Sequence, residues 1–367
     1  YRIEAAPNDS AMQSVMSSTY TAGYRLGMIV AGAGSLMLAQ WLGSTKAHYA
    51  YGAWQQTYWA MAATMLVGVA ATLWVREPAA QQAQTEGQNV DDNVRLLAMF
   101  VLAVLAFVAA FRQMDALLPE HAASPLAALL WETLRLAGSL AAAVAVGCLA
   151  VGIRLVRAEV VRRVWIAPLA DFFARYGKRA ALLLALIGLY RISDIVSGVI
   201  SNVFYADMGF SKVEIASAVK TFGVAMSILG GIAGGVLAQR FRLMNMMMLG
   251  AVAAAATNLL FVWLALRGHD VPLMYTAVGL DNFAAGLAGT VFVAFLSALT
   301  NIRFTAVQYA LFSSLMTLLP KTIGGYSGAI VKQIDYTGFF LFTAALGVPI
   351  LLLVWWADRV LFRDEAA

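Results

Sequence analysis

Long apolar stretches alternate with short polar segments along most of the chain. A bilayer core about 30 Å thick is crossed by about 20 residues of helix, because each residue adds ~1.5 Å. The stretches are rich in Ala, Leu, Val and Gly and lack a period of two, so they predict helices rather than barrel strands. The predicted spans are 19–42, 54–75, 95–111, 126–153, 180–206, 212–238, 243–266, 271–299, 303–330 and 337–357. The expected fold is an all-α polytopic membrane bundle.

Composition supports a lipid-facing surface. Hydrophobic residues make up 61% of the chain and charged residues 12%. A soluble domain carries about 25% charged residues, since its surface must be wetted. The lipid bilayer is therefore the first expected partner.

The basic residues predict an orientation, because Lys and Arg accumulate on the cytoplasmic side of membrane proteins. When the ten spans are threaded alternately with residue 1 inside, fourteen Lys and Arg residues fall on the inner side. Five fall on the outer side, namely Lys46, Arg112, Lys212, Arg267 and Lys332. We expect both ends of the chain to be cytoplasmic. The net charge of +5 is then a topology signal and does not indicate nucleic-acid binding.

The predicted spans group into a domain organisation. Segment 1–77 holds two spans, 78–93 is a polar linker, and 94–153 holds an extra pair of hydrophobic helices. Segment 154–179 is basic, and is either an amphipathic cytoplasmic helix on the inner leaflet or an ordinary inner loop. Segment 180–367 holds six spans with short loops, which force antiparallel neighbours. Paired six-helix units are the architecture of major facilitator transporters, so we expect a piece of such a protein without its first four spans.

Charges inside the spans are the informative departures from the apolar pattern, since each costs about 2.5–3.5 kcal/mol at mid-bilayer. Arg191 and Asp194 lie three residues apart on one helix face and can pair. They form either a structural ion pair or a cavity-facing pair that binds an anion or a proton. Asp281, followed by Asn282, lies at mid-depth of its span and is either a proton acceptor or the partner of Arg191.

Further polar residues are candidates for a central passage. Arg25 either snorkels to the inner interface or faces a cavity. Lys321 follows Pro320 at an expected helix break, where backbone groups would be exposed to a cavity. The remaining candidates are Tyr190, Gln308 and Tyr309.

Glycines at four-residue spacing predict close helix contacts, because the missing side chain lets two backbones approach. They are expected either to pack statically or to act as rocking interfaces. The pairs are Gly23/Gly27, Gly230/Gly234, Gly231/Gly235 and Gly324/Gly328.

The sequence carries no G-x-S-x-G elbow, Walker loop or H-E-x-x-H motif. We therefore expect no enzyme, no metal site and no cofactor, and an ion gradient as the driving force.

Several segments resemble known families. The sequence GGVLAQRFR at 234–242 resembles the major facilitator loop motif, with Gln239 where an Asp is usual. Longer segments resemble the AmpG family of muropeptide permeases: YRIE at 1–4, GYRLGMIVAGAGSLMLA at 23–39, and residues 171–216, 257–265, 279–301 and 304–321. The family's early acidic motif precedes YRIE and is absent from this chain.

The resemblance implies an inner-membrane transporter of Gram-negative bacteria. Such proteins import N-acetylglucosaminyl-anhydro-N-acetylmuramyl peptides from the periplasm with protons, for peptidoglycan recycling and β-lactamase induction. We expect a monomer in which Arg191, with Arg25 and Lys321, contacts cargo carboxylates. Asp194 and Asp281 are expected protonation sites, and the Tyr190 and Tyr309 rings are expected to stack on sugars.

Three alternatives stay open at this stage. The first is a related facilitator for acetyl-CoA or peptides. The second is a membrane-embedded acyl- or glycosyltransferase, although such enzymes place acidic or His residues at a membrane face. The third is a sensor that does not transport.

Overall fold

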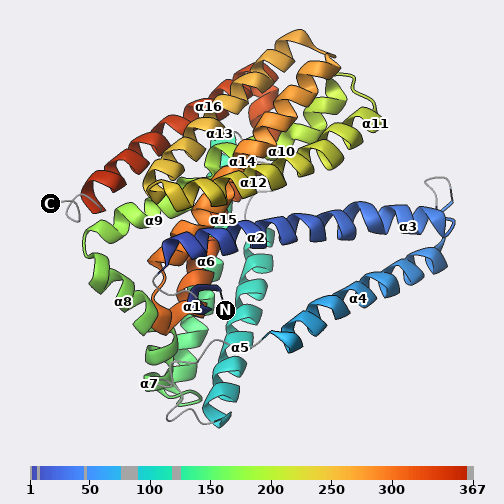
Figure 1. The fold of residues 1–367 in the computed structure, drawn as a ribbon. Coiled ribbons are helices and arrows are strands. Elements are labelled where there is room, and N and C mark those ends of the chain that lie inside the picture. Colours follow the sequence, from blue (N-terminus) through green and yellow to red (C-terminus); the bar gives the residue numbers. More distant parts are fainter. Residues whose placement is uncertain (1, 6–8, 45–47, 76–89, 118–124, 362–367) are drawn as a thin grey trace.

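The computed structural model describes residues 2–5, 9–44, 48–75, 90–117 and 125–361. All regular structure in these ranges is helical (Figure 1). In chain order the α-helices are α1 (Arg2–Ala5), α2 (Ser10–Ile29), α3 (Ser35–Trp41), α4 (Tyr51–Trp74), α5 (Val90–Leu117), α6 (Pro125–Gly152), α7 (Ala158–Val161), α8 (Ala167–Tyr176), α9 (Arg179–Leu189), α10 (Ile192–Asp207), α11 (Lys212–Ile215), α12 (Gly223–Arg240), α13 (Leu243–Arg267), α14 (Val271–Leu299), α15 (Thr305–Gly324) and α16 (Ser327–Leu361). Short π or 3-10 turns join some of them: η1 (Val30–Gly34), η3 (Arg162–Ile166), η4 (Ala216–Phe222) and η5 (Ile302–Phe304).

Ten helical segments of the described chain are long and apolar enough to cross a bilayer, which confirms the predicted fold class. The first segment, Met12–Trp41, begins earlier than the predicted 19–42. The third is 28 residues long, well beyond the predicted 95–111, because helix α5 includes the polar turn at Asp91 and Asp92. Most of the predicted linker 78–93 lies outside the described residues.

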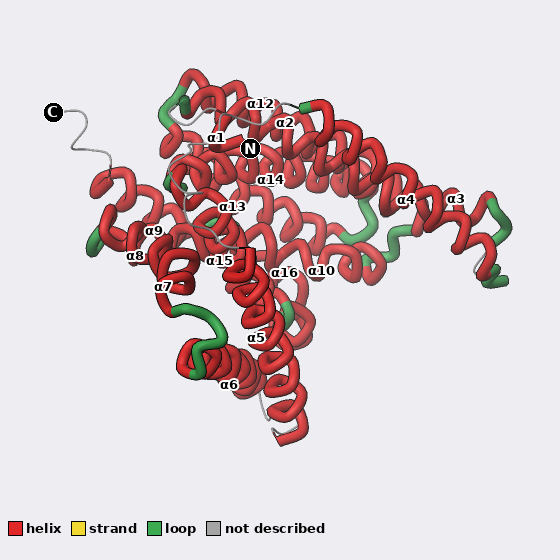
Figure 2. The backbone as a smooth tube through the Cα atoms, turned by 90° about the horizontal axis from the view of Figure 1, so that it is seen from below, coloured by secondary structure: helices red, strands yellow, loops and turns green. Residues whose placement is uncertain are grey.

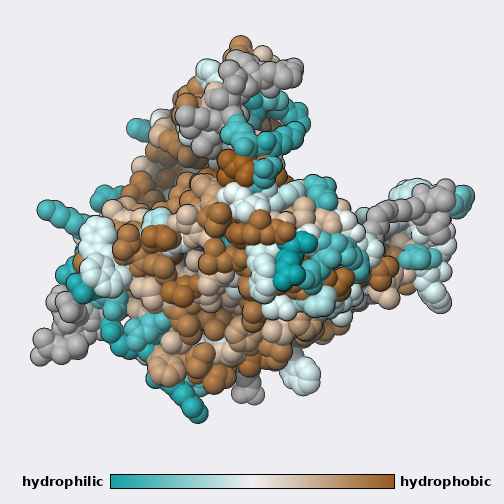
Figure 3. Space-filling model, turned by 90° about the horizontal axis from the view of Figure 1, so that it is seen from above, coloured by the Kyte–Doolittle hydropathy of each residue, from teal (hydrophilic) through white to brown (hydrophobic). Residues whose placement is uncertain are grey.

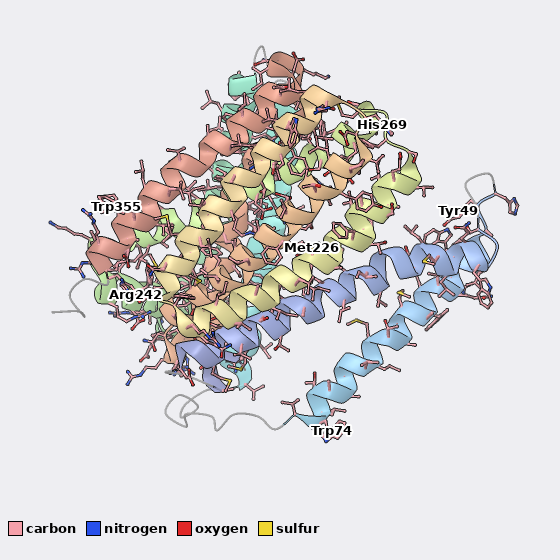
Figure 4. All side chains as sticks on the ribbon, turned by 45° about the horizontal axis from the view of Figure 1, so that its top comes forward. Tyr49, Trp74, Met226, Arg242, His269 and Trp355 are labelled. Carbon is pink, nitrogen blue, oxygen red and sulfur yellow. The ribbon has the colours of Figure 1, made fainter. Side chains whose placement is uncertain are left out.

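A tightly packed core occupies the C-terminal part of the chain. Helix α14 lies across its centre, with buried residues along most of its length (Figure 1). Phe204, Phe261 and Phe340 from α10, α13 and α16 form an aromatic cluster with ring centroids 4.9–6.5 Å apart. Aromatic rings in edge-to-face or offset contact add stability beyond the area that they bury. One end of this unit carries α8, Arg242 and Trp355, and the opposite end carries His269 (Figure 4).

The glycines of α12 contact two different helices. A Cβ at Gly230 would lie 2.0 Å from the carbonyl oxygen of Phe283 on α14, so the two backbones touch. On the adjacent face, a Cβ at Gly235 would lie 2.6 Å from Ser18 on α2. The Ser18 hydroxyl also donates to the carbonyl oxygen of Gly231 at 3.0 Å. Small residues and a hydroxyl at such a contact are typical of helix packing in lipid.

The other glycine pairs differ from the prediction. An added Cβ at Gly23, Gly27 or Gly328 would meet no atom of the described chain within 4 Å. Gly324 contacts Val199 on α10, so it alone of these four residues lies against another helix.

Two helical hairpins extend away from the central unit (Figure 2). In one, α3 continues the rod of α2 and α4 returns beside it, with Tyr49 and Trp74 near its two ends (Figure 4). In the other, α5 and α6 pack against each other. Arg135 on α6 joins this pair by donating to Asp115 of α5 at 3.0 Å. It also donates to Glu132 of its own helix at 2.8 Å. Apolar side chains cover a broad area of the surface, as a lipid-facing protein requires (Figure 3).

Two of the long segments are broken. Tyr190 and Arg191 separate α9 from α10 within one span. In α16, Asp335 adopts φ 57° and ψ 175°, which interrupts the helix there. Contrary to prediction, α15 does not break at Pro320, because the helix continues through the proline to Gly324. The interruption comes at 325–326, just before α16.

Within segment 154–179, residues 158–176 are helical and α8 lies against the bundle. Phe172 is buried and its ring packs on that of Phe312 in α15, with centroids 5.1 Å apart. Leu169 and Phe173 remain exposed on another side of α8. The amphipathic pattern therefore places one apolar residue in the core and leaves a second apolar face at the surface.

The contact between α12 and α14 predicts the effect of a small substitution. Gly230→Ala places a methyl group against the backbone of Phe283, which cannot move aside as a flexible side chain would. Overpacking of this kind costs about 1–3 kcal/mol. We expect a lower melting temperature in detergent, measured by thermal unfolding.

The control is Gly68→Ala on α4, where an added Cβ meets nothing within 4 Å. Its melting temperature should stay the same or rise slightly, since Ala favours helix. Equal melting temperatures for the two variants would contradict the close contact.

Candidate functional site

An ion pair lies at the break between α9 and α10. Arg191 occupies the break, and its Nη2 donates to the Asp194 carboxylate in the first turn of α10. A carboxylate in the first turn is also favoured by the helix dipole. The two side chains are 23% and 19% exposed. The Nε of Arg191 is buried and has no acceptor in the described part of the chain, so this donor is left unsatisfied there.

Asp281 on α14 belongs to the same group of charges. Its Oδ1 accepts a hydrogen bond from the Thr257 hydroxyl of α13 at 3.0 Å. The carboxylate is half-buried and lies within electrostatic range of Arg191 and Asp194. The direct partner of Arg191 is thus Asp194, and Asp281 is held by a neutral hydroxyl.

Arg25 completes the group from α2. Its side chain is half-buried and lies within electrostatic range of both Arg191 and Asp194. The α2–α12 contact places it there, because Ser18 on α2 is tied to Gly231 on α12. The Arg25 side chain therefore lies among charged groups of the bundle. Helices α2, α10 and α14 together bring two guanidinium groups and two carboxyl groups to one place.

A buried polar layer lies behind these charges. The Asn258 amide of α13 donates to the Ser193 hydroxyl of α10 at 2.8 Å, and Ser193 donates to the carbonyl oxygen of Thr343 on α16 at 2.8 Å. Sequence reasoning missed this layer, although Thr257-Asn258 interrupts an apolar span. Such hydrogen bonds hold α10 in register and so fix the neighbouring Asp194.

A cavity of about 760 Å³ lies between α2 and α15 and is also lined by α1. Binding sites for small molecules are typically about 300–1,000 Å³. Its lining residues are Ile3, Met16, Thr19, Tyr20, Thr305, Ala306, Tyr309, Ala310 and Ser313. Tyr309 lies here as a cavity residue, as expected, and Tyr20 was missed by sequence reasoning.

Tyr190 does not face this cavity. It is 4% exposed, its ring stacks on Phe292 at 4.6 Å, and its hydroxyl donates to the carbonyl oxygen of Met247 at 2.9 Å. In this conformation both the ring and the hydroxyl are occupied by protein. The expected stacking of Tyr190 on a sugar is therefore replaced by a packing role.

Two other candidates lie apart from the ion pair. The Asn282 amide donates to the Val278 carbonyl of its own helix at 2.9 Å. Lys321 is exposed on α15, in a helix that is unbroken at that point.

Gln308 joins α15 to α8. It is 1% exposed, and its amide nitrogen donates to the carbonyl oxygen of Pro168 at 2.8 Å and to Asp171 at 3.0 Å. Its amide oxygen accepts from Arg175 at 3.1 Å and from the backbone nitrogen of Asn301 at 2.8 Å. Gln308 is thus the centre of a polar network that joins α15 to α8, and it is not among the residues that line the cavity.

Asp171 is the charged member of this α8–α15 network. Burial alone would raise its pKa, but hydrogen bonds from Gln308 and Asn301 and the adjacent Arg175 outweigh burial and lower the pKa below its usual value. The ionised carboxylate is therefore the form that the folded network favours.

Comparisons with known proteins identify relatives over most of the chain. It is 25% identical over 346 residues to the Putative transporter AmpG 4 of Rickettsia conorii, covering 94% of this chain and 65% of the relative. It is 28% identical over 334 residues to the Anhydromuropeptide permease of Escherichia coli, covering 90% and 51%. A Putative transporter AmpG 1 of Rickettsia conorii is 32% identical over 173 residues, covering 47% and 42%. No family model matches the chain.

Relatives named AmpG or anhydromuropeptide permease thus match most of the chain, and they support its relationship to the AmpG family. The chain spans 65% of the length of the AmpG 4 relative, so properties of the whole relative do not transfer automatically. The names of these relatives are those of transporters and a permease, which points away from an enzyme. Together with the ten candidate spans, they make this chain a multi-pass membrane protein.

The α8–α15 network predicts a pH-dependent docking of α8. Asp171→Asn removes the charge that Arg175, Gln308 and Asn301 stabilise, and about 1–2 kcal/mol is a typical loss for such hydrogen bonds. We expect the α8 amides to exchange hydrogen roughly five- to thirtyfold faster at neutral pH, measured by mass spectrometry.

The lowered pKa gives the sign of the pH effect. The stabilisation is present above the ordinary carboxyl pKa of 3.8 and is lost as the pH falls through the lower folded value. The difference between wild type and variant should therefore shrink in acid, after correction for intrinsic rates. Asp91→Asn, at the exposed start of α5, should leave α8 exchange unchanged. Unchanged α8 exchange in Asp171→Asn would contradict the role of this network.

Proposed function

We propose that this protein imports anhydro-muropeptides from the periplasm to the cytoplasm across the bacterial inner membrane, together with protons. It acts as a major facilitator-type carrier without a cofactor and feeds peptidoglycan recycling and β-lactamase induction. The observation that carries the proposal is the convergence of Arg25, Arg191, Asp194 and Asp281 inside a membrane bundle. The name of the Escherichia coli relative, an anhydromuropeptide permease, supplies the cargo class.

The charge balance of this group explains how a proton and an anionic cargo would be coupled. With both carboxyl groups ionised, the two arginines are balanced. When Asp281 takes a proton, one positive charge is left without its counter-charge, and a cargo carboxylate restores the balance. Protonation and cargo binding then favour each other, as linkage requires for two ligands with a favourable coupling free energy.

The roles of the two carboxyl groups differ in this mechanism. Asp194 is engaged by Arg191, so protonating it would break an ion pair inside the membrane. Asp281 is held by the Thr257 hydroxyl, which can also serve a neutral carboxylic acid. Asp281 is accordingly the better proton carrier, and Arg191 with Arg25 contacts the cargo.

The basic residues around α8 support an orientation with the α8 end in the cytoplasm. Both chain ends then face the cytoplasm, in line with the excess of Lys and Arg on that side.

The direct test is uptake of radiolabelled anhydro-muropeptide by vesicles under an imposed pH gradient. We expect accumulation that collapses with a protonophore and is competed by unlabelled anhydro-muropeptide. Competition by acetyl-CoA or plain peptides alone would favour a related facilitator. Uptake that ignores the pH gradient would contradict proton coupling.

The charged group is tested by two substitutions. Arg191→Ala removes a cargo contact and leaves Asp194 unpaired, and Asp281→Asn removes the exchangeable proton. We expect uptake to fall by at least about a hundredfold in each, because a lost charge partner in a desolvated site costs about 3–5 kcal/mol. Uptake is compared at equal amounts of membrane-inserted protein.

The control is Arg267→Gln, an exposed residue at the end of α13, which should transport normally. Normal uptake by Arg191→Ala or Asp281→Asn would reduce that residue to a packing role.

A further inference from the structure

A groove separate from the cavity between α2 and α15 lies between α9 and α16. Its volume is about 430 Å³, and it is lined by the first turns of α9 and the last turns of α16. These two helix ends lie together at the end of the bundle that carries α8 (Figure 1). The groove shares no lining residue with the other cavity and contains no member of the charged group, so it is a distinct feature of the surface.

The walls of this groove are apolar. On α9, Ala181 and Ala185 lie one turn apart, and their short side chains leave room beside α16. On α16, the opposite wall is made by Leu353, Trp356 and Val360. The stretch from Leu353 to Val360 covers about 10 Å of helix, at ~1.5 Å per residue. Both helices belong to candidate membrane spans, so the groove suits a hydrocarbon chain taken from the bilayer.

The groove also has a basic part. Lys178 and Arg179 line it at the start of α9, and both are exposed. Gly177, with a φ of 51°, turns the chain from α8 into α9 and so brings these two side chains to the groove. Two cationic heads beside apolar walls are complementary to a ligand that carries an anionic group on a hydrocarbon chain.

Tryptophan side chains indicate the depth of this basic part in the membrane. Trp is enriched where the hydrocarbon core meets the headgroups. Trp356 lines the groove and is exposed, and the adjacent Trp355 is exposed with the Arg359 guanidinium 3.8 Å from the centre of its ring. Lys178 and Arg179 therefore lie at the level of the phospholipid phosphates.

We propose that the groove between α9 and α16 binds an anionic phospholipid, with its phosphate at Lys178 and Arg179 and one acyl chain along Ala181, Ala185 and Leu353. Basic pockets between membrane helices on the cytoplasmic side are known to bind anionic headgroups. A zwitterionic lipid offers the same acyl chains without the net negative charge, so it satisfies the walls and not the basic part. The bound lipid joins the α8–α9 turn to the end of α16, and this inference does not depend on the cargo.

The test is native mass spectrometry of the whole chain in detergent, with phosphatidylglycerol or with phosphatidylcholine of the same acyl chains. We expect the wild type to retain one phosphatidylglycerol in preference to phosphatidylcholine. Lys178→Gln should weaken retention of phosphatidylglycerol roughly fivefold, because one basic residue beside an anionic lipid contributes about that factor. Ala181→Leu fills the groove while keeping both charges, and should weaken retention at least as much.

Thermal unfolding gives a second measurement. A lipid that binds only the folded protein raises its melting temperature by mass action. Phosphatidylglycerol should therefore raise the melting temperature of the wild type more than phosphatidylcholine does, and this difference should disappear in Ala181→Leu.

The matched control is Arg240→Gln, an exposed basic residue at the end of α12 that does not line the groove. It should retain phosphatidylglycerol as the wild type does. Equal retention by Lys178→Gln, Ala181→Leu and Arg240→Gln, or equal retention of both lipids by the wild type, overturns the proposal. A dimer without retained lipid that is lost in Ala181→Leu would assign the groove to a second copy of the chain and also overturn it. If Ala181→Leu fails to insert, the comparison of Lys178→Gln with Arg240→Gln still decides.

Discussion

The ion pair between Arg191 and Asp194 constrains the centre of the bundle. Two charges inside a membrane protein remain only where partners and a polar surrounding offset the loss of water. The break between α9 and α10 provides this surrounding, because it places Arg191 outside helical geometry and Asp194 in the first turn of the next helix. The buried layer of Ser193, Asn258 and Thr343 then fixes α10 behind the pair. The charged pair is therefore held in place by hydrogen bonds between uncharged groups of neighbouring helices.

Close backbone contact brings the second arginine to this centre. Arg25 lies on a helix far away in sequence, and the small residues of α2 dock it against the glycines of α12. The same α12 uses its other glycines to touch α14, which carries Asp281. One glycine-rich helix thus sets the separation between Arg25 and Asp281. A shift of α12 relative to α2 or α14 would change that separation without breaking any strong hydrogen bond.

Apolar periodicity was sufficient to predict the ten spans and the all-α fold, because lipid demands long apolar helices. The pairing of Arg191 with Asp194 was also predictable, since both residues lie on one turn. The position of Tyr190 was not predictable, because adjacent residues on a broken helix can point into the core or into a cavity. Gln308 illustrates the same difficulty: its partners on α8 are more than a hundred residues away in sequence. Tyr20 was missed because it lines a cavity only together with residues of α15, which are distant in sequence, and no feature of its own segment indicates this.

Helix α15 is anchored near its start and weakened near its end. Its first turns are held by Gln308 to α8, and the next residue, Tyr309, faces the cavity. Farther along, the helix passes Pro320, meets Val199 of α10 at Gly324, and is interrupted before α16. A missing backbone hydrogen-bond donor and an interruption make bending easier there than near Gln308. Because one end is anchored and the other is weakened, a rearrangement of α15 would bend its far half while the cavity-lining Tyr309 stays with α8. The cavity wall at Tyr309 would then keep its position, whereas the contact of Gly324 with Val199 of α10 would change.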